Sequence, residues 1–404
     1  MKVCFETFGC RLNKAEALQM EADYLAKGWE LTEKHADADL IVVRGCSVTA
    51  RAQNDCETLI AHLKRKYPTT RLLICGCISS AGAPARQVAP LSTTSHQPPP
   101  TNHQPLTTNH QPVPTRTARA YLKVQDGCNG KCSFCIVPHF RGKSVSVDFT
   151  EVLDKANRFI DAGYHEIVVT GCNLALYCSQ GKRLPELLDA LAKLSAPADC
   201  RIRLGSLEPG GCALETIAVL AENDNICRFL HLAIQSGSRI ILKNMRRPYT
   251  SKDVEDVLSE AERRLPHLGL GCDLMTGFPG ETETDFLVTK GLLSRHPFTN
   301  AHVFPYSERP NTPAESFSNP VPKEIRSFRA QYLANISQQN RITFARHFIG
   351  RTVDVVVEKS EKELAGWTGE YLRCHFTGKA PRKSLVRVFV TKAEKDLLRG
   401  RLVT

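Results

Sequence analysis

The sequence predicts an α/β protein in three folded parts: a first domain of βαβ type on a parallel sheet, a central partial (β/α)6 barrel, and a small C-terminal β-barrel. Short apolar strand patterns alternate with amphipathic helix patterns over residues 2–74 and again over residues 120–306. The composition changes abruptly at about residue 82, and beyond residue 347 only strand patterns remain. We therefore expect domains at residues 1–81, 118–346 and 347–404, with a linker at 82–117.

The composition indicates where the protein acts, what its cysteines do and what kind of partner it binds. The chain has 404 residues, of which 42% are hydrophobic, and neither an apolar leader nor a run of about eighteen apolar residues occurs. We expect a cytoplasmic monomer without a membrane part. Sixteen cysteines in a reducing compartment favour metal ligation over disulfides. A formal net charge of +11 favours a polyanionic partner.

The first domain reads as βαβαβ. Strands are expected at residues 2–7, 40–43 and 71–74, and a second helix at 51–67. The first helix is expected to begin at Asn13, with Glu16 three residues later completing the cap, and to end at Gly28.

Each strand of the first domain is followed by a cysteine. Cys10, Cys46 and Cys77 follow strands one, two and three, and parallel strands linked by helices place their carboxyl ends at one edge of the sheet. The three thiols should therefore converge into a site with an open position. The alternative is that each cysteine separately fills the core. Cys75 is a second candidate for the third ligand, but it lies within the apolar run, whereas Cys77 follows it.

The linker contains a seven-residue tandem repeat. The repeat is rich in Pro and Thr, cannot bury a core, and is expected to be extended. Its evenly spaced His96, His103 and His110 suggest a metal site, but without ordered structure to bring them together we favour a passive linker.

The central segment alternates strand and helix signals. Strands are expected at residues 120–124, 166–170, 201–204, 229–234, 271–276 and 301–306. In such a partial barrel the chemistry lies at the carboxyl ends of the strands. Polar stretches at residues 170–173, 235–238 and 277–281 follow later strands, although each by itself could be a turn.

A loop after the first of these strands carries three cysteines. Cys128, Cys132 and Cys135 have C-x3-C-x2-C spacing, and nearby glycines let the backbone wrap around a small body. Three thiolates suit an iron–sulfur cluster with one open iron. With His139 as a fourth ligand they would form a structural zinc site, and a purely structural cluster of cysteines is a third alternative.

The loop, with Phe134 before its last cysteine, resembles that of radical S-adenosylmethionine enzymes. Residues 120–128 and 135–142 look like the methylthiotransferase branch, and so do the short motifs around the three cysteines of the first domain. The resemblance implies that Cys128, Cys132 and Cys135 hold the catalytic [4Fe–4S] cluster, whose open iron binds S-adenosylmethionine. It implies an auxiliary [4Fe–4S] cluster on Cys10, Cys46 and Cys77. The cofactor-binding candidates it implies are Phe134, Gly171, Asn173 and Gln235.

The chain departs from this family at three places. Arg44 and Gly45 stand where the family more often has Asn-Thr, and residues 82–117 replace globular sequence that normally completes the first domain. Cys172 and Cys178 replace residues that are not ligands in the family, and we interpret both as structural.

The C-terminal segment is basic. Strands are expected at residues 353–358, 370–376 and 386–391, with cations between or on them: Arg373, Lys379, Arg382, Lys383 and Arg387. A run of basic residues is usually just a solvated face. Because this segment follows the catalytic region in the chain, it resembles TRAM, the small RNA-binding β-barrel of the tRNA-modifying members of the family.

The resemblance implies a radical reaction that inserts a methylthio group at C2 of N6-threonylcarbamoyladenosine 37 in tRNA. The needed partners are tRNA, an electron donor for cluster reduction, and a sulfur source. The alternatives are the branches that act on isopentenyladenosine 37 or on a ribosomal protein. A cluster-bearing RNA-binding protein without turnover is a second alternative.

Overall fold

The computed structural model describes residues 1–78, 116–360 and 363–403. The chain forms two compact units, Met1–Thr115 and Arg116–Thr404, and each is described by itself. Most of the predicted linker, with His96, His103 and His110, lies outside the described residues.

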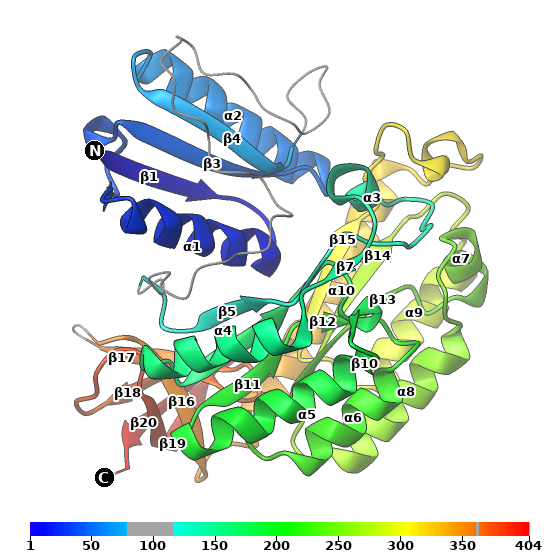
Figure 1. Ribbon diagram of the computed structural model, residues 1–404. Coiled ribbons are helices and arrows are strands. Elements are labelled where there is room, and N and C mark those ends of the chain that lie inside the picture. The colour runs from blue at the N-terminus through cyan, green and yellow to red at the C-terminus, as the bar shows by residue number, and fades with distance from the viewer. Residues whose placement is uncertain (79–115, 361–362, 404) are drawn as a thin grey trace. The chain divides into compact units, whose positions relative to one another are not determined.

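The first unit is a parallel sheet between two helices. The strands are β1 (Lys2–Thr7), β2 (Glu30–Leu31), β3 (Leu40–Cys46) and β4 (Arg71–Cys77), in the order β2-β1-β3-β4. Helices α1 (Arg11–Ala26) and α2 (Ala50–Lys66) lie on opposite faces of this sheet (Figure 1). Alternate residues of each strand supply the two cores, as Val42 does on the α1 face and Ile41 on the α2 face. The predicted βαβαβ order is confirmed, with β2 and the short helix η1 (His35–Asp37) added.

The predicted cap at Asn13 is wrong. Helix α1 begins at Arg11, and its N-cap residue Cys10 makes no side-chain capping bond. The Asn13 amide is buried and donates to the backbone oxygens of Phe8 and Gly45, at 2.9 Å each. Asn13 therefore joins the turn after β1 to the end of β3 instead of opening the helix.

The second unit contains a curved parallel sheet in two separately hydrogen-bonded parts, one of three strands and one of four. Its main strands match the predicted six: β5 (Ala120–Lys123), β8 (Glu166–Thr170), β11 (Arg201–Leu204), β13 (Phe229–Gln235), β14 (Gly269–Thr276) and β15 (Asn300–Pro305). Strand β11 pairs with β8, and after Gly205 the chain continues as β12 (Ser206–Leu207), which pairs with β13. A Cβ at Gly205 would lie 2.7 Å from the Val169 carbonyl oxygen. The glycine therefore permits the close approach at which the chain passes from one set of strands to the next.

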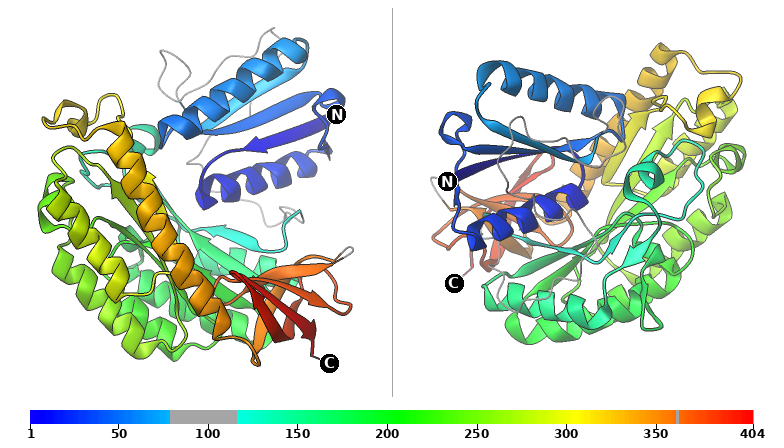
Figure 2. Two further views of the ribbon diagram at one scale, coloured as in Figure 1. Left: turned by 180° about the vertical axis from the view of Figure 1, so that it is seen from behind. Right: turned by 45° about the horizontal axis from the view of Figure 1, so that its top comes forward.

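Helices cover one face of this sheet, as the two further views also show (Figure 2). They are α4 (Phe149–Asp161), α5 (Leu184–Ser195), α6 (Ala213–Glu222), α8 (Ser251–Arg264) and α9 (Glu283–Arg295). The short α3 (Val137–Arg141) and α7 (Arg239–Asn244) lie in the connections, together with β6 (Gln125–Asp126), β7 (Val145–Ser146), β9 (Cys178–Ser179), β10 (Lys182–Arg183), η2 (Leu174–Leu176), η3 (Ala196–Ala198) and η4 (Pro313–Ser316). The long α10 (Lys323–Arg346) packs along β15 and α9 and reaches the C-terminal strands. No helix among the described residues is long and apolar enough to cross a membrane.

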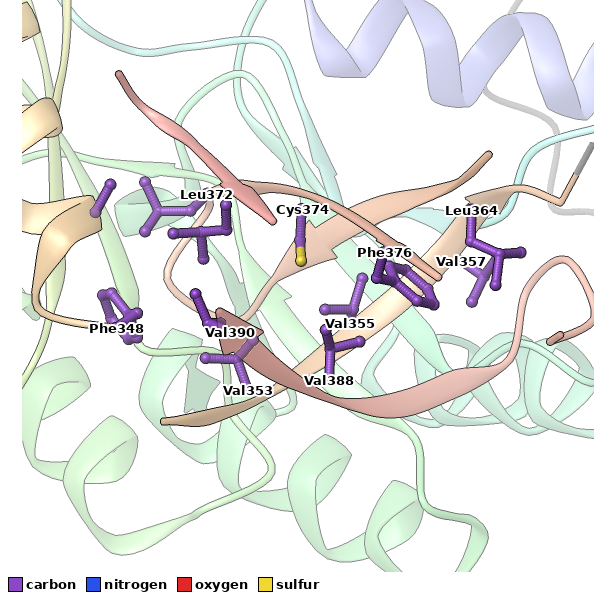
Figure 3. Packing of buried hydrophobic residues seen from close by; sticks show 12 residues of the cluster. Phe348, Val353, Val355, Val357, Leu364, Leu372, Cys374, Phe376, Val388 and Val390 are labelled. Atoms are coloured by element: carbon purple, nitrogen blue, oxygen red, sulfur yellow. The ribbon is translucent and has the colours of Figure 1, made fainter. Parts of the chain in front are cut away.

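The C-terminal strands close into a barrel. They are β16 (Thr352–Lys359), β17 (Leu364–Thr368), β18 (Arg373–Thr377), β19 (Leu385–Glu394) and β20 (Leu397–Leu402), in the order β16-β17-β18-β20-β19. Val355, Cys374 and Val388 point into the core between them (Figure 3). The sequence predicted three of these strands and missed β17 and β20.

A buried charge cluster joins this barrel to the central sheet. Glu166 on β8 is fully buried and pairs with Arg203 at 2.7 Å and Arg201 at 2.6 Å. Burial alone would raise the pKa of Glu166, but Arg203, Arg201 and Arg119 outweigh it and hold the pKa well below its ordinary value. Arg203 also donates to the barrel oxygens of Thr368 (2.8 Å) and Gly369 (3.0 Å). The barrel is thereby anchored to the sheet by charge-assisted bonds.

Candidate metal centres

The loop with three cysteines is shaped by its glycines. It follows β6 and ends in α3, and the Cys128 amide donates to the Gly142 carbonyl at 3.0 Å. Gly127 has a φ of +67°, and a Cβ there would lie 2.0 Å from the Lys143 carbonyl oxygen. The Gly130 amide donates to the Cys128 sulfur at 3.3 Å. These contacts fold the chain back on itself and bring the Cys128 and Cys132 sulfurs to the same glycine, Gly130.

The loop is held in place by contacts with two other segments of the second unit. The Ser133 amide donates to the Met245 carbonyl at 3.0 Å, and its hydroxyl donates to the Asn244 carbonyl at 2.8 Å. The Phe134 ring packs edge-on against Phe278, with centroids 6.4 Å apart. Phe134, a cofactor-binding candidate, therefore lies at the border between the cysteine loop and an apolar core.

An arginine in the segment after α7 contacts the cysteine loop. Arg247 donates to the Cys132 sulfur at 3.0 Å and pairs with Glu208. Burial raises the pKa of the Cys132 thiol and that of Cys135, the latter to about 12, while Arg247 acts in the opposite direction. Ligation to iron would deprotonate these thiols outright, and Arg247 is placed to stabilise the negative charge that follows.

Two of the predicted cofactor residues, Gly171 and Asn173, lie on one polar network beside the loop. The Gln125 side-chain oxygen accepts from the Asn173 amide at 2.9 Å, and the Asn173 side chain donates to Glu208 at 2.8 Å. A Cβ at Gly171 would lie 2.9 Å from the same Gln125 oxygen and 3.1 Å from the Gln125 backbone oxygen, so a side chain there would crowd Gln125. Glu208 thus connects Asn173 to Arg247 and, through it, to Cys132.

Gln235, the last residue of β13, carries an unsatisfied polar atom. Its φ is +67°, its side chain is 8% exposed, and its Oε1 has no hydrogen-bond partner among the described residues. A buried amide oxygen without a partner is costly unless a ligand supplies a donor. This position therefore suits the amino or hydroxyl groups of a polar cofactor.

The second set of cysteines comes from three segments of the first unit. Cys10 follows β1 and precedes α1, while Cys46 and Cys77 end β3 and β4 and stand opposite each other in register. Gly9, with a φ of +91°, approaches so closely that a Cβ would lie 2.9 Å from the Cys46 sulfur. The sheet edge thus gathers all three segments, as the strand order predicted.

Cys75 is held elsewhere. It packs against the core on the α1 face of the sheet, and Arg44 reaches its sulfur at 3.7 Å. The Arg44 guanidinium also forms a buried ion pair with Glu16. At Gly45 a Cβ would lie 2.9 Å from the Cys56 sulfur, so the absence of a side chain leaves room for Cys56. Arg44 and Gly45, which differ from the more common Asn-Thr, thus both fit their surroundings.

No disulfide bond joins any two of the sixteen cysteines, all of which are among the described residues. Cys172 donates to Asp126 at 3.4 Å, and Cys178 is exposed on β9. Asp126 is an anchor of the loop: burial would raise its pKa, but Lys123 and Arg141 hold the pKa well below its ordinary value.

Comparison with known proteins identifies the family of this chain. The family model described as "Radical SAM superfamily" matches residues 122–293, and that described as "Uncharacterized protein family UPF0004" matches residues 2–89. The Bacillus subtilis protein named threonylcarbamoyladenosine tRNA methylthiotransferase MtaB is 30% identical, over 99% of this chain and 96% of that protein. A tRNA-2-methylthio-N(6)-dimethylallyladenosine synthase of Bordetella bronchiseptica is 31% identical, over 99% of this chain and 92% of that protein.

The chain belongs to the radical S-adenosylmethionine methylthiotransferase family. S-adenosylmethionine and two [4Fe–4S] clusters are therefore its cofactors. Among solved structures, the radical S-adenosylmethionine methyltransferase TsrM of Kitasatospora setae has a TM-score of 0.53 at 14% identity, covering 78% of this chain and 74% of that one. That likeness concerns the fold alone.

Sequence reasoning assigned no role to Gln125, Glu208 and Arg247. Each stands in a stretch that resembles the family, Gln125 before the cysteines, Glu208 in Leu-Glu-Pro and Arg247 in Met-Arg-Arg-Pro. Glu208 directly follows β12, whereas Gln125 begins β6 and Arg247 comes after α7, so strand position alone could have indicated only Glu208. Only the tertiary structure shows that the three are linked to one another and to Cys132.

Proposed function

We propose that this enzyme transfers a methylthio group to C2 of N6-threonylcarbamoyladenosine 37 in tRNA. The observation that carries the proposal is near-complete coverage at 30% identity by a relative named for that reaction. Similar relatives from Chlamydia pneumoniae and Aquifex aeolicus have the same name. The motif around Cys10, Gly-Cys-Arg-Leu-Asn, looks most like that of this branch of the family.

The two cysteine sets would divide the work. Cys128, Cys132 and Cys135 would ligate the cluster that binds S-adenosylmethionine, and Cys10, Cys46 and Cys77 would ligate the auxiliary cluster. When bound, these groups supply the one-electron chemistry that opens an unactivated C–H bond and the sulfur that replaces its hydrogen.

The chain's own residues position that chemistry. Arg247 would hold Cys132 and balance its negative charge, while Glu208 keeps Arg247 and Asn173 in place. The orphaned amide oxygen of Gln235 would accept a hydrogen bond from the cofactor. Gly171 would keep the backbone close enough to Gln125 for the polar network to form.

We further propose that the enzyme works as a monomer in the cytoplasm, where six ligand thiols remain reduced. An electron donor and a sulfur source would act with it, and the basic C-terminal barrel would hold the tRNA.

Mass spectrometry of tRNA nucleosides from cells with and without the gene tests the substrate. The 2-methylthio derivative of N6-threonylcarbamoyladenosine should disappear on deletion. Loss of the isopentenyl derivative, or of a ribosomal-protein modification, would move the assignment to another branch. Unchanged modification in every fraction would leave a cluster-bearing RNA-binding protein without turnover.

A further inference from the structure

The barrel's cations are not equivalent. The sequence grouped five of them, but three make structural contacts. Arg373 pairs with Glu358 at 2.6 Å and lies over Trp367, and Arg382 donates to the carbonyl oxygens of Glu358 and Arg116. Lys383 lies over the ring of Tyr164 at 4.0 Å. These side chains join parts of the barrel to one another and to Arg116 and Tyr164, which lie outside it. Other side chains must therefore contact an external partner.

One row of side chains crosses four neighbouring strands on the outside of the barrel. Register places Thr352 of β16 opposite Phe389 of β19, Phe389 opposite Arg401 of β20, and Arg401 opposite Thr377 of β18. The inward positions beside Phe389 are the buried Val388 and Val390, so the alternation of the strand turns Phe389 outward. Neighbouring strands lie about 4.8 Å apart, so the four side chains form a continuous strip.

The centre of this strip is an aromatic ring next to a guanidinium. Arg401 is exposed, and its guanidinium carbon lies 5.4 Å from the centroid of the Phe389 ring. Arg387, two residues before Phe389 on the same face, is also exposed. Within the described barrel neither arginine has an ion-pair partner, although Asp354 stands opposite Arg387 in register.

We propose that Phe389, flanked by Arg387 and Arg401, is a platform on which an unpaired base of the tRNA stacks. The proposal rests on the proposed function and deepens it, since it names the part of the RNA that the barrel contacts. Aromatic rings on barrel strands bind bases of single-stranded nucleic acid through their π-faces, and nearby guanidinium groups add phosphate and cation–π contacts. Thr352 and Thr377 at the two ends of the strip offer hydroxyls to the ribose and phosphate groups.

The charge pattern favours RNA over a protein partner. An apolar docking surface would need several adjacent apolar side chains, whereas this strip has a single ring between hydroxyl and guanidinium groups. A base paired in a helix has no free face to stack, so the platform selects a loop.

The test compares two RNA probes: an anticodon stem–loop, and the same stem closed by a non-nucleotide linker. Phe389→Ala in the full-length protein should weaken binding to the stem–loop by at least about fivefold, leave binding to the linker-closed stem unchanged, and keep the salt dependence. Phe389→Trp should restore the loss. Arg387→Gln and Arg401→Gln should each lower the log–log salt slope by up to about 0.7.

Phe328→Ala is the matched control, because Phe328 is a 65% exposed aromatic on α10 and should leave binding to both probes unchanged. Equal weakening of both probes by Phe389→Ala would mean a structural role and overturn the platform. Wild-type affinity in Phe389→Ala would do the same. In either case the assay of tRNA nucleosides still shows whether the proposed reaction occurs. Failure of the platform can therefore be distinguished from failure of the proposed function.

Discussion

The two cysteine sets are built in opposite ways. Cys128, Cys132 and Cys135 lie within eight residues of one loop, and local glycines bend that loop. Cys10, Cys46 and Cys77 span 68 residues, and only the parallel sheet brings their segments together. The first arrangement depends on local backbone geometry, and the second depends on the folding of a whole unit.

This difference predicts different sensitivities. At Gly130 of the loop a Cβ would meet only side-chain sulfurs, which can adjust, although Gly127 of the same loop faces the Lys143 backbone. At the sheet edge a glycine can instead face the backbone of the neighbouring strand, which cannot move without disturbing the sheet. Gly76 shows this, since a Cβ there would lie 2.7 Å from the Gly45 carbonyl oxygen and its φ is +95°.

The largest expected effect separates the two sets completely. Replacing Cys128, Cys132 and Cys135 together by Ala should reduce the iron of the reconstituted protein from about eight to about four, and so should replacing Cys10, Cys46 and Cys77. Only the first triple variant should lose deoxyadenosine formation, while both should lose methylthiolation. Stoichiometric zinc without iron absorbance after reconstitution would contradict the assignment of either set.

A second comparison tests which cysteine of β4 is the ligand. Cys77→Ala should remove about half of the iron, because Cys77 stands opposite Cys46, whereas Cys75→Ala should leave the iron content unchanged. Iron and sulfide assays on both proteins provide the measurement. The reverse result would place the auxiliary cluster on the α1 face of the sheet.

Charge burial gives a third expected effect, in the unit that holds the loop set. Glu166→Gln would leave Arg203 and Arg201 buried without their carboxylate and should cost roughly 3–5 kcal/mol in the free energy of unfolding. Because the folded-state pKa of Glu166 lies below its unfolded value, its contribution is present above about pH 4.3 and is lost as the pH falls further. Denaturant titrations at neutral and acidic pH should therefore show the difference from wild type shrinking in acid.

The glycines provide a smaller and more direct contrast. Gly76→Ala should lower auxiliary iron and the unfolding midpoint, since both its φ and a backbone atom oppose a side chain. Gly130→Ala should have a smaller effect, because a Cβ there would meet only side-chain sulfurs, of Cys128 at 3.2 Å and of Cys132 at 3.7 Å. Equal iron loss in the two variants would show that the loop set is as rigid as the sheet-edge set.

The smallest effect concerns the repeat between the units. Deleting residues 103–109 shortens the predicted linker by one repeat and should change the closure free energy by only a few tenths of a kcal/mol. Methylthiolation and iron content should therefore survive, and a triple His→Ala replacement of His96, His103 and His110 should behave alike. Loss of half of the iron in either variant would instead indicate a structural role in the first unit.

The sequence by itself determined the local features. The C-x3-C-x2-C spacing, the six central strands and the cysteines after each strand of the first unit could all be predicted, because each depends on periodicity and turn chemistry within a few residues. The convergence of Cys46 and Cys77 was also predictable, since parallel strands share one carboxyl edge.

What only the tertiary structure decided were the partners of polar side chains. Asn13 looked like a helix cap but joins β1 to β3, and Arg373 was grouped with the cations of the RNA-binding barrel but pairs with Glu358. Strands β17 and β20 escaped prediction because their pattern makes sense only in a closed barrel. A side chain's local sequence limits what it can bond, but its partner is chosen among groups brought near by segments distant in the chain, and no local pattern encodes that choice.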